Sequence, residues 1–477
     1  MKKSLKNASK TGTVSSTPPK GLVSSFTPWR RAAAPFALLA AAFFLSATVW
    51  GATNYYSVPP SDAPELAPRG PYDVGVRTIQ LVHPGQVDVV HFDKATGKAS
   101  LYDRPLTVEV WYPAQIPAGT KIETVYKMPW PGGAKINGSA AVDIPDKAMR
   151  DATPLAGKIF PLVIVSHGYP GSRYFLSYLT ANLASKGYVV AAIDHTDSVF
   201  DAQREFASTL INRSRDQLFT IDSIAELSAK ADNFLHGIVD ATNVAVVGYS
   251  MGGYGALTTA GAGYSDKSAL MNLVPGGYLK PLAANSDEFK KRDLSRLKAI
   301  VAIAPWGEQA PFSAWDADGL AGIKVPSLFI AGDHDDVADY ANGIRPAFEE
   351  AVHSERCILV YENARHNTGG NPAPAVDLPF PLTQAFDEPA WRKERIIAIN
   401  QHFITAFLDL YLKGDQAKSA YLHVAPERSN DGKWDVPARA PDKGAFSSGK
   451  DDKGDLFWKG FQRRDALGME MSCKAAQ

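Results

Sequence analysis

The sequence contains little cysteine and no excess of charge of either sign. Only two cysteines, Cys357 and Cys473, occur among 477 residues, so the chain is not a disulfide-rich scaffold. The 50 basic and 50 acidic side chains cancel, and no net charge therefore favours nucleic acid as a partner. No Cys-x-x-Cys or His-x-His pair occurs, and His195 and Asp197 stand alone, so we expect no metal site.

The two cysteines leave two interpretations open. In an oxidising compartment, Cys357 and Cys473 can form a disulfide that closes a long loop, worth roughly 4 kcal/mol in the chain-entropy model. Alternatively, one is a buried thiol and the other a thiol in a loose tail. The sequence does not decide between them.

The first 52 residues predict export from the cytoplasm. Residues 1–31 carry seven basic and no acidic side chains, and residues 32–52 carry no charge. A basic segment before an apolar stretch is typical of a secretory signal or of a membrane anchor with its N-terminus in the cytoplasm. We expect a periplasmic or extracellular protein, with signal and transmembrane anchor both open. Residues 53–77, rich in Pro, Ser and Ala, are interpreted as a linker.

Strand and helix patterns alternate through the middle of the chain. Apolar runs that indicate strands occur at 106–112, 160–165, 188–193, 299–304, 327–331 and 358–361. Helical patterns lie between them at 174–185, 215–229 and 391–412. The alternation predicts an α/β fold over residues 78–425, with a mostly parallel, doubly wound sheet and helices on both faces. Residues 426–477 form a C-terminal extension, in which the polar stretch 429–455 is expected to be a loop or loose tail.

A serine stands where such a fold holds a nucleophile. The pentapeptide Gly248-Tyr249-Ser250-Met251-Gly252 follows the apolar run 244–247 and precedes a helix-favouring stretch. A serine between two glycines in this context is typical of the nucleophile elbow of α/β-hydrolases. Strand and helix pass so close at this turn that the residues two before and two after the serine must lack bulky side chains. We predict Ser250 as a nucleophile.

A base and an orienting acid follow Ser250 in the order that this fold uses. His366 lies on a loop after the strand that ends at Tyr361. Asp335 lies three residues past Gly332, at the end of an earlier strand, and Asp333 is its main rival. We predict that His366 takes the proton of Ser250 while Asp335 orients the imidazole.

The oxyanion formed in such a reaction needs hydrogen-bond donors. One is expected to be the backbone N–H of Met251, the residue after the nucleophile. The second is expected from the loop 167–172, where the N–H of Tyr169 is the candidate. A tight exit from the strand is the structural alternative for His167 and Gly168.

Several segments resemble the dienelactone-hydrolase-like and platelet-activating-factor-acetylhydrolase-like branch of the α/β-hydrolases. They are Val110–Ala114, Phe160–Tyr169, Leu183–Val190 and Arg213–Asp216, and the resemblance spans roughly residues 75 to 425. It implies hydrolysis of carboxylic esters with no metal or organic cofactor. Dienelactone hydrolases have a cysteine where this chain has Ser250, so lactone specificity is not implied.

Other residues are similar to those of cutinase-type polyester hydrolases. The acetylhydrolases place their acid on the strand after the nucleophile, where this chain reads Ala304-Pro305-Trp306. That tripeptide, together with Asp335, is instead similar to the cutinase type, whose corresponding tryptophan lines the acyl cleft. The resemblance implies that Trp306 contacts substrate, with core packing as the alternative. Tyr169 is expected to line the same cleft.

The prediction is a serine hydrolase of a small-molecule or lipid-like ester, acting through an acyl-enzyme. Two alternatives remain: an amide or peptide hydrolase with the same triad, and a catalytically silent binding module. Two long connections, Asp197–Asn212 and Asn371–Pro389, lie near the expected pocket rim and receive no specific role. Oligomeric state is left open.

Overall fold

The computed structural model describes residues 55–202, 205–434 and 456–477. The expected basic segment 1–31 and the expected signal or anchor 32–52 lie outside the described residues. Within the described ranges, no helix combines the length and the apolarity needed to cross a bilayer.

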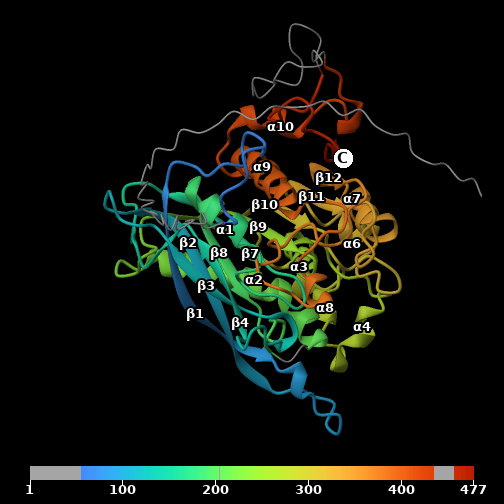
Figure 1. Ribbon diagram of the computed structural model, residues 1–477. Helices are drawn as coiled ribbons and strands as arrows, with labels where there is room; N and C mark the ends of the chain where they lie inside the picture. Colours follow the sequence, from blue (N-terminus) through green and yellow to red (C-terminus); the bar gives the residue numbers. More distant parts are fainter. Residues whose placement is uncertain (1–54, 203–204, 435–455) are drawn as a thin grey trace, which may run out of the picture. The chain divides into compact units, whose positions relative to one another are not determined.

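One large sheet carries the fold (Figure 1). In space its strands follow the order β13-β12-β11-β10-β9-β7-β8-β2-β1-β5, with β6 paired to β2. In chain order they are β1 (Asp73–Val87), β2 (Leu101–Gln115), β5 (Met149–Arg150), β6 (Thr153–Pro154), β7 (Phe160–Ser166), β8 (Val189–Asp194), β9 (Val239–Tyr249), β10 (Leu297–Ile303), β11 (Ser327–Gly332), β12 (Arg356–Tyr361) and β13 (Met469–Lys474). A separate hairpin pairs β3 (Thr124–Pro129) with β4 (Ala141–Asp146).

The middle of the sheet is parallel and its edges are mostly antiparallel. Neighbouring strands from β8 through β7, β9, β10 and β11 to β12 run parallel. The pairs β1 with β2, β2 with β8 and β12 with β13 are antiparallel. The parallel strands are buried almost throughout, as their continuous apolar runs predict.

Helices cover both faces of this sheet (Figure 1). Helices α1 (Ser177–Ser185) and α9 (Lys393–Leu412) pack together on one face. Helices α2 (Phe206–Ala229) and α3 (Met251–Ala260) pack together on the other. The short helices are α4 (Leu270–Leu273), α5 (Asp287–Lys290), α6 (Ala317–Leu320), α7 (Arg345–Glu350), α8 (Phe380–Thr383) and α10 (Ser419–Leu422). The α/β-hydrolase fold expected from the sequence is confirmed.

Helix α2 begins earlier than its sequence pattern indicates. Its first residue is Phe206 rather than Arg215, so part of the expected connection Asp197–Asn212 is helical. All seven residues from Ser208 to Ser214 are buried, although most of them are polar. Polar side chains that satisfy one another inside the protein leave no apolar stripe in the sequence, and the period of the helix is hidden there.

The segment expected as a linker is held against the helices. Asn182 of α1 donates to the carbonyls of Ser57 and Ala67 at 3.2 and 2.9 Å. Lys186 uses its three ammonium hydrogens on Leu66 O, Asn182 Oδ1 and Thr405 Oγ1. Strand β1 then begins at Asp73, inside the range 53–77. These polar contacts order the segment together with a few apolar side chains: Ala63 and Ala67 are buried, and Tyr56 and Leu66 pack against the core.

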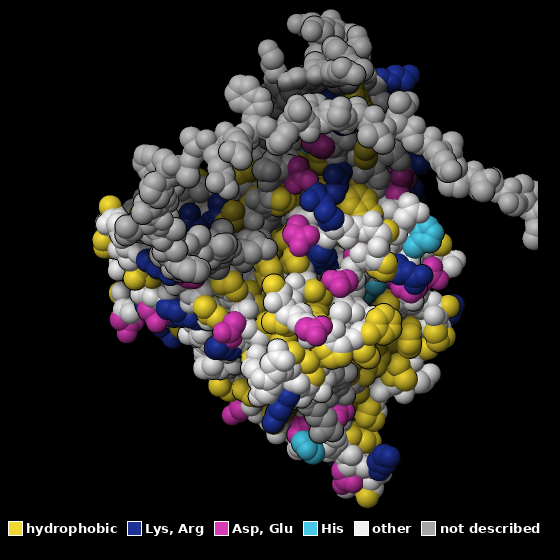
Figure 2. All heavy atoms as spheres, viewed as in Figure 1, with side chains coloured by type: hydrophobic (Ala, Val, Ile, Leu, Met, Phe, Trp, Pro, Cys, Tyr) yellow, Lys and Arg dark blue, Asp and Glu magenta, His cyan; other side chains and the backbone are white. Residues whose placement is uncertain are grey.

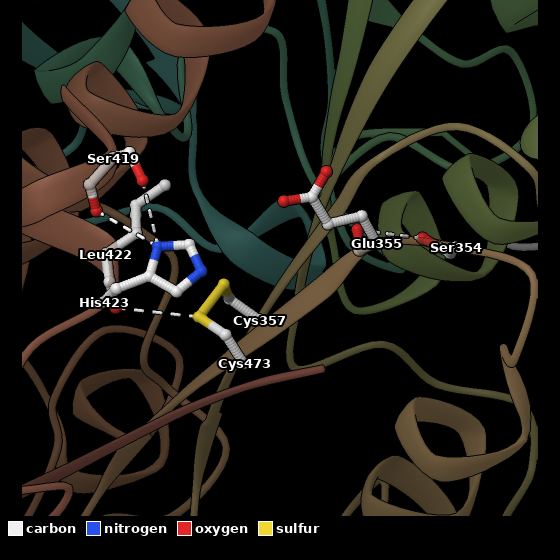
Figure 3. The surroundings of a disulfide bond; sticks show 7 residues. All are labelled: Ser354, Glu355, Cys357, Ser419, Leu422, His423 and Cys473. Atoms are coloured by element: carbon white, nitrogen blue, oxygen red, sulfur yellow. Dashed lines mark hydrogen bonds between the residues drawn. A yellow bond between two sulfur atoms is a disulfide. The ribbon is translucent and has the colours of Figure 1, made fainter. Parts of the chain in front are cut away.

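The C-terminal extension adds an edge strand to the sheet. β13 pairs antiparallel with β12, and Cys357 lies directly opposite Cys473. The two cysteines form a disulfide between these strands, beside Leu422 and His423 of the α10 region (Figure 3). Of the two interpretations left open by the sequence, the structure therefore has the disulfide. Part of the expected loose tail, residues 435–455, lies outside the described residues.

Replacing both cysteines, Cys357→Ala with Cys473→Ser, is expected to lower the free energy of unfolding by up to about 5 kcal/mol. The disulfide joins residues 116 positions apart, and removing so long a crosslink frees the unfolded chain. Urea unfolding with and without a reducing agent measures the effect. The reducing agent should destabilise the parent chain and leave the double variant unchanged; equal effects on both would contradict the expectation.

Candidate active site

Ser250 occupies a strained turn between β9 and α3. Its backbone has φ 53° and ψ −115°, a left-handed conformation that costs a non-glycine residue about 1–3 kcal/mol. A Cβ added at Gly248 would lie 2.0 Å from the carbonyl oxygen of Gly252. One added at Gly252 would lie 2.0 Å from the carbonyl oxygen of Ser166. Both glycines are therefore required by close backbone approach, as the sequence predicts.

The turn is held in place by the neighbouring strand. The N–H of Ser250 donates to Ile303 O of β10 at 2.8 Å, and the N–H of Trp306 donates to Ser250 O at 3.3 Å. Main-chain bonds from β10 and its following loop therefore fix the serine from both sides.

Ser250, His366 and Asp335 come together in one hydrogen-bonded series. His366 Nε2 lies 2.9 Å from Ser250 Oγ, and His366 Nδ1 lies 2.8 Å from Asp335 Oδ2. An ionised carboxylate only accepts, so Nδ1 carries the proton and Nε2 accepts from the serine hydroxyl. The three residues are 5–9% exposed, which leaves the serine reachable but mostly shielded from water.

Asp335 and its rival Asp333 have different partners. The second oxygen of Asp335 accepts the N–H groups of Val337 and Ala338 at 2.9 and 2.8 Å, which fixes the carboxylate toward His366. Asp333 instead contacts the exposed His334 and accepts from the N–H of Asn363. Only Asp335 of the two contacts His366.

The expected oxyanion loop passes next to the serine. A Cβ added at Gly168 would lie 3.4 Å from Ser250 Cβ. Arg213 of α2 is 1% exposed and donates to the carbonyls of His167 and Gly168 at 2.8 and 3.4 Å. Because these carbonyls point toward Arg213, this side chain fixes the orientation of the loop. Met251 begins α3, whose N-terminal N–H groups carry the positive end of the helix dipole.

A buried polar cluster lies beside this loop, and no residue spacing in the sequence predicted it. His195 Nδ1 lies 2.9 Å from Asp216 Oδ2, and His195 Nε2 lies 2.8 Å from Ser166 Oγ. Arg104 donates to both oxygens of Asp216 at 2.9 and 3.1 Å. The main-chain N–H of His195 donates to His167 Nε2 at 3.2 Å. The cluster joins β2, β7, β8 and α2 beneath the oxyanion loop.

The charges in this cluster are fixed by its burial. Burial opposes ionisation of Asp216, but Arg104 and His195 outweigh it and hold the pKa of Asp216 below its usual range. Burial and the nearby Arg213 lower the pKa of His195 to about 3, so its imidazole is neutral. Ser166, His195 and Asp216 thus have the same pairing as the triad, but each is at most 1% exposed, and no substrate reaches them.

A cavity of about 300 Å³ opens over Ser250 and His366. We call it the serine cavity; its other walls are largely apolar and include Tyr169, Phe175 and Phe200. Tyr169 therefore lines the cavity, as expected. Apolar walls of this kind suit the apolar part of a ligand.

Trp306 lies beside the site but not on the wall of this cavity. Its main chain bonds to Ser250, as described, and its ring is 9% exposed. The ring packs edge-on against Phe206 and lies 4.7 Å from the ring centre of Phe312. Phe206 in turn packs against Tyr169. Trp306 is therefore a packing residue in this structure. Phe206 lies between its ring and Tyr169 of the cavity wall.

No group of metal-binding side chains occurs in the described ranges of the chain.

Comparison with known proteins gives matches to PET hydrolases and cutinases. Residues 151–278 match a family model described as PET hydrolase-like; this range includes the oxyanion loop and Ser250 but neither Asp335 nor His366. Cutinase est1 of Thermobifida alba is 25% identical over 214 residues, which are 45% of this chain and 55% of that protein. Cutinase cut1 of Thermobifida fusca is 25% identical over 214 residues, 45% of this chain and 51% of that protein.

A further relative is the bis(hydroxyethyl) terephthalate hydrolase of Streptomyces coelicolor. It is 24% identical over 208 residues, 43% of this chain and 50% of that protein. The chain thus spans about half the length of the relatives it matches. The similarity to cutinase-type polyester hydrolases expected from Ala304-Pro305-Trp306 and Asp335 is confirmed at this level. The chain has the α/β-hydrolase fold and is similar, over its central part, to PET hydrolases and cutinases.

Proposed function

We propose that the chain is a serine carboxylic-ester hydrolase that acts through an acyl-enzyme on Ser250. The observation that carries the proposal is the series Asp335, His366 and Ser250, with distances of 2.8 and 2.9 Å, at the wall of a largely apolar cavity. The relatives named cutinase and terephthalate-ester hydrolase support the same reaction class. The substrate is a small-molecule or lipid-like ester.

The proposed steps use the geometry already described. Ser250 Oγ attacks the ester carbonyl while His366 Nε2 takes the serine proton, and the oxyanion faces the N–H groups of Met251 and Tyr169. The C–O bond to the alcohol then breaks, and the alcohol leaves with the proton from His366. Water then attacks the acyl-serine while His366 takes a proton from the water and returns it to Ser250 Oγ. One ester and one water thus give one acid and one alcohol.

Export is proposed with this function. The disulfide between Cys357 and Cys473 favours an oxidising compartment, because the cytosol keeps most thiols reduced. This agrees with the basic and then apolar character of residues 1–52. A cleaved signal and a retained anchor both fit these observations.

The first experiment measures hydrolysis of p-nitrophenyl esters from acetate to palmitate by the full chain and by Ser250→Ala. Turnover is expected to be fastest with short to medium acyl chains, since a serine cavity of about 300 Å³ is at the small end for ligand pockets. The variant should lose about a million-fold in kcat. A folded parent that neither turns over nor reacts with a fluorophosphonate would favour the binding module. Faster cleavage of matched anilides would favour an amide hydrolase.

Substitution of the two rival aspartates separates their roles. Asp335→Asn is expected to lower kcat about ten-thousandfold, because the amide no longer holds the His366 tautomer that accepts from Ser250. Asp333→Asn is the matched control and should keep most activity, since Asp333 contacts His334 and Asn363 instead. The reverse pattern in steady-state kinetics would assign the acid to Asp333.

Arg213→Lys tests whether the oxyanion loop depends on its anchor. A lysine cannot reach His167 O, Gly168 O and Ser198 Oγ with one planar fork, so kcat is expected to fall roughly 100- to 1000-fold, as on loss of one oxyanion donor. KM should change little, because ground-state contacts remain. Arg215→Lys, two residues away in α2, is the control. A folded Arg213→Lys protein with unchanged kcat would show that the loop needs no such anchor.

A further inference from the structure

A second cavity lies beside His366, on the side away from the oxyanion loop. Its volume is about 620 Å³, and Val337, His366 and Asn367 line both it and the serine cavity. Neither Ser250 nor Tyr169 belongs to its lining. We call it the α8 cavity, because Phe380 and Thr383 of α8 form part of its wall. The two cavities therefore meet at His366.

The wall of the α8 cavity is hydrogen-bonded to the loop that carries His366. The side-chain amide of Asn367 donates to Gln384 O and Asp387 O at 2.7 and 2.8 Å. Lys393, the first residue of α9, donates to the main-chain carbonyl of Asn367. The connection Asn371–Pro389, which had no role in the sequence analysis, is thus fixed relative to His366.

The chemistry of the proposed reaction determines which part of the ester faces each cavity. The carbonyl oxygen must face the loop at Gly168 and Tyr169, which borders the serine cavity. The alcohol oxygen must face His366 Nε2, because that atom supplies its proton. The alcohol part therefore extends past His366, where the α8 cavity lies.

The lining of the α8 cavity combines carboxylates with an exposed aromatic ring. Asp336 is paired with Arg365, whereas Asp387 and Glu388 form no ion pair with any described residue. Glu388 is 5% exposed, and its carboxylate oxygens form no well-aligned hydrogen bond with the described part of the chain; their favourable neighbours are the N–H groups of Arg365 and Ala390 and the charges of Lys393 and Arg365. Phe380 is 75% exposed. On the face shown in Figure 2, apolar side chains gather in the region of α8, with acidic ones beside them.

Such a lining suits a cation. Ammonium groups bind to aromatic faces and pair with carboxylates, and both are present here. Burial raises the pKa of Glu388, and a cation beside it would favour the charged form. Lys393 and Arg365 both attract Glu388 and therefore oppose a further cation. Burial lowers the pKa of Lys393 to about 7, which weakens its opposition near neutral pH, and Arg365 is paired with Asp336.

We propose that the α8 cavity binds the alcohol part of the ester and prefers an alcohol that carries a cationic ammonium group. Asp387 and Glu388 supply the negative charge, and Phe380 supplies an aromatic face. The proposal rests on the proposed function, because the direction of the ester follows from the role of His366.

A pair of isosteric substrates tests the preference. Choline butyrate and 3,3-dimethylbutyl butyrate have the same acyl group and nearly the same shape, and differ by one positive charge. The full chain is expected to hydrolyse the choline ester with a kcat/KM roughly three- to tenfold higher, the range that one ion pair and one cation–aromatic contact give. The comparison with p-nitrophenyl butyrate, which has no cation, reports the basal activity.

Variants of the cavity wall locate the preference. Asp387→Asn, Glu388→Gln and Phe380→Ala should each reduce the ratio of the two kcat/KM values toward about one, whatever their effect on the neutral ester alone. Asp377→Asn is the matched control, since Asp377 is an exposed acid of the same connection that does not line the cavity. Its ratio should equal that of the parent chain.

The outcomes separate this proposal from the proposed function. No Ser250-dependent hydrolysis of any ester overturns both. Hydrolysis of both butyrates with a ratio near one, or with the neutral ester preferred, overturns the cation site and leaves the esterase. A preference that survives in Asp387→Asn and Glu388→Gln, or that Asp377→Asn removes equally, overturns the assignment to the α8 cavity. A preference for 2-hydroxyethyl butyrate over propyl butyrate that Glu388→Gln abolishes, without any cation preference, replaces the cation with a hydroxyl.

Discussion

The close approach of α3 to the centre of the sheet is the constraint on which the site depends. Two backbone contacts, at Gly248 and Gly252, leave no room for a Cβ and force Ser250 into a left-handed conformation. Strain of about 1–3 kcal/mol persists only where the surroundings over-determine it. Here the neighbours that do so are β10 and its exit loop, through Ile303 and Trp306. The position of the serine is thus a property of the whole parallel sheet rather than of a local loop.

Buried polar groups beside the expected oxyanion loop restrict the conformation of that loop. Arg213 is held by burial and by three oxygen acceptors, and its pKa falls to about 9 while the guanidinium stays charged near neutral pH. Asp216 of the same helix, Arg104 of β2 and neutral His195, which follows β8, complete the cluster. Buried polar networks are costly when any partner is missing, so this one resists rearrangement. The hydrogen bonds of Arg213 therefore fix the orientation of the loop beside Ser250.

The sequence predicted the parts of the molecule that follow from local patterns. Apolar runs located the parallel strands, since burial on both faces leaves a continuous run such as 160–165. The two glycines around Ser250, and the placement of Asp335 and His366 after strand ends, located the candidate triad. These signals are local because each depends on a turn or a strand end. The sequence left substrate contact and core packing open for Trp306, because the orientation of its ring depends on Phe206 and Phe312, which are not adjacent to it in sequence.

What the sequence could not predict depends on contacts between distant polar residues. The cluster of Arg104, His195 and Asp216 spans more than a hundred positions and has no spacing that marks it. Strand β13 and the ordered segment 55–72 were likewise hidden, because a disulfide and single hydrogen bonds hold them.

The connection Asn371–Pro389 shows the consequence most clearly. Its composition is that of an inert Pro-rich surface loop, and its contacts with Asn367 and the carboxylates of Asp387 and Glu388 at the cavity wall distinguish it. The family model matches residues 151–278 and therefore omits this wall entirely. The matched part holds Ser250 and the loop at Gly168, whose proposed roles are the same for any ester. The α8 cavity, which is proposed to receive the alcohol, lies outside the matched part. Under the proposed function, the alcohol specificity of this chain therefore depends on the connection as well as on the triad.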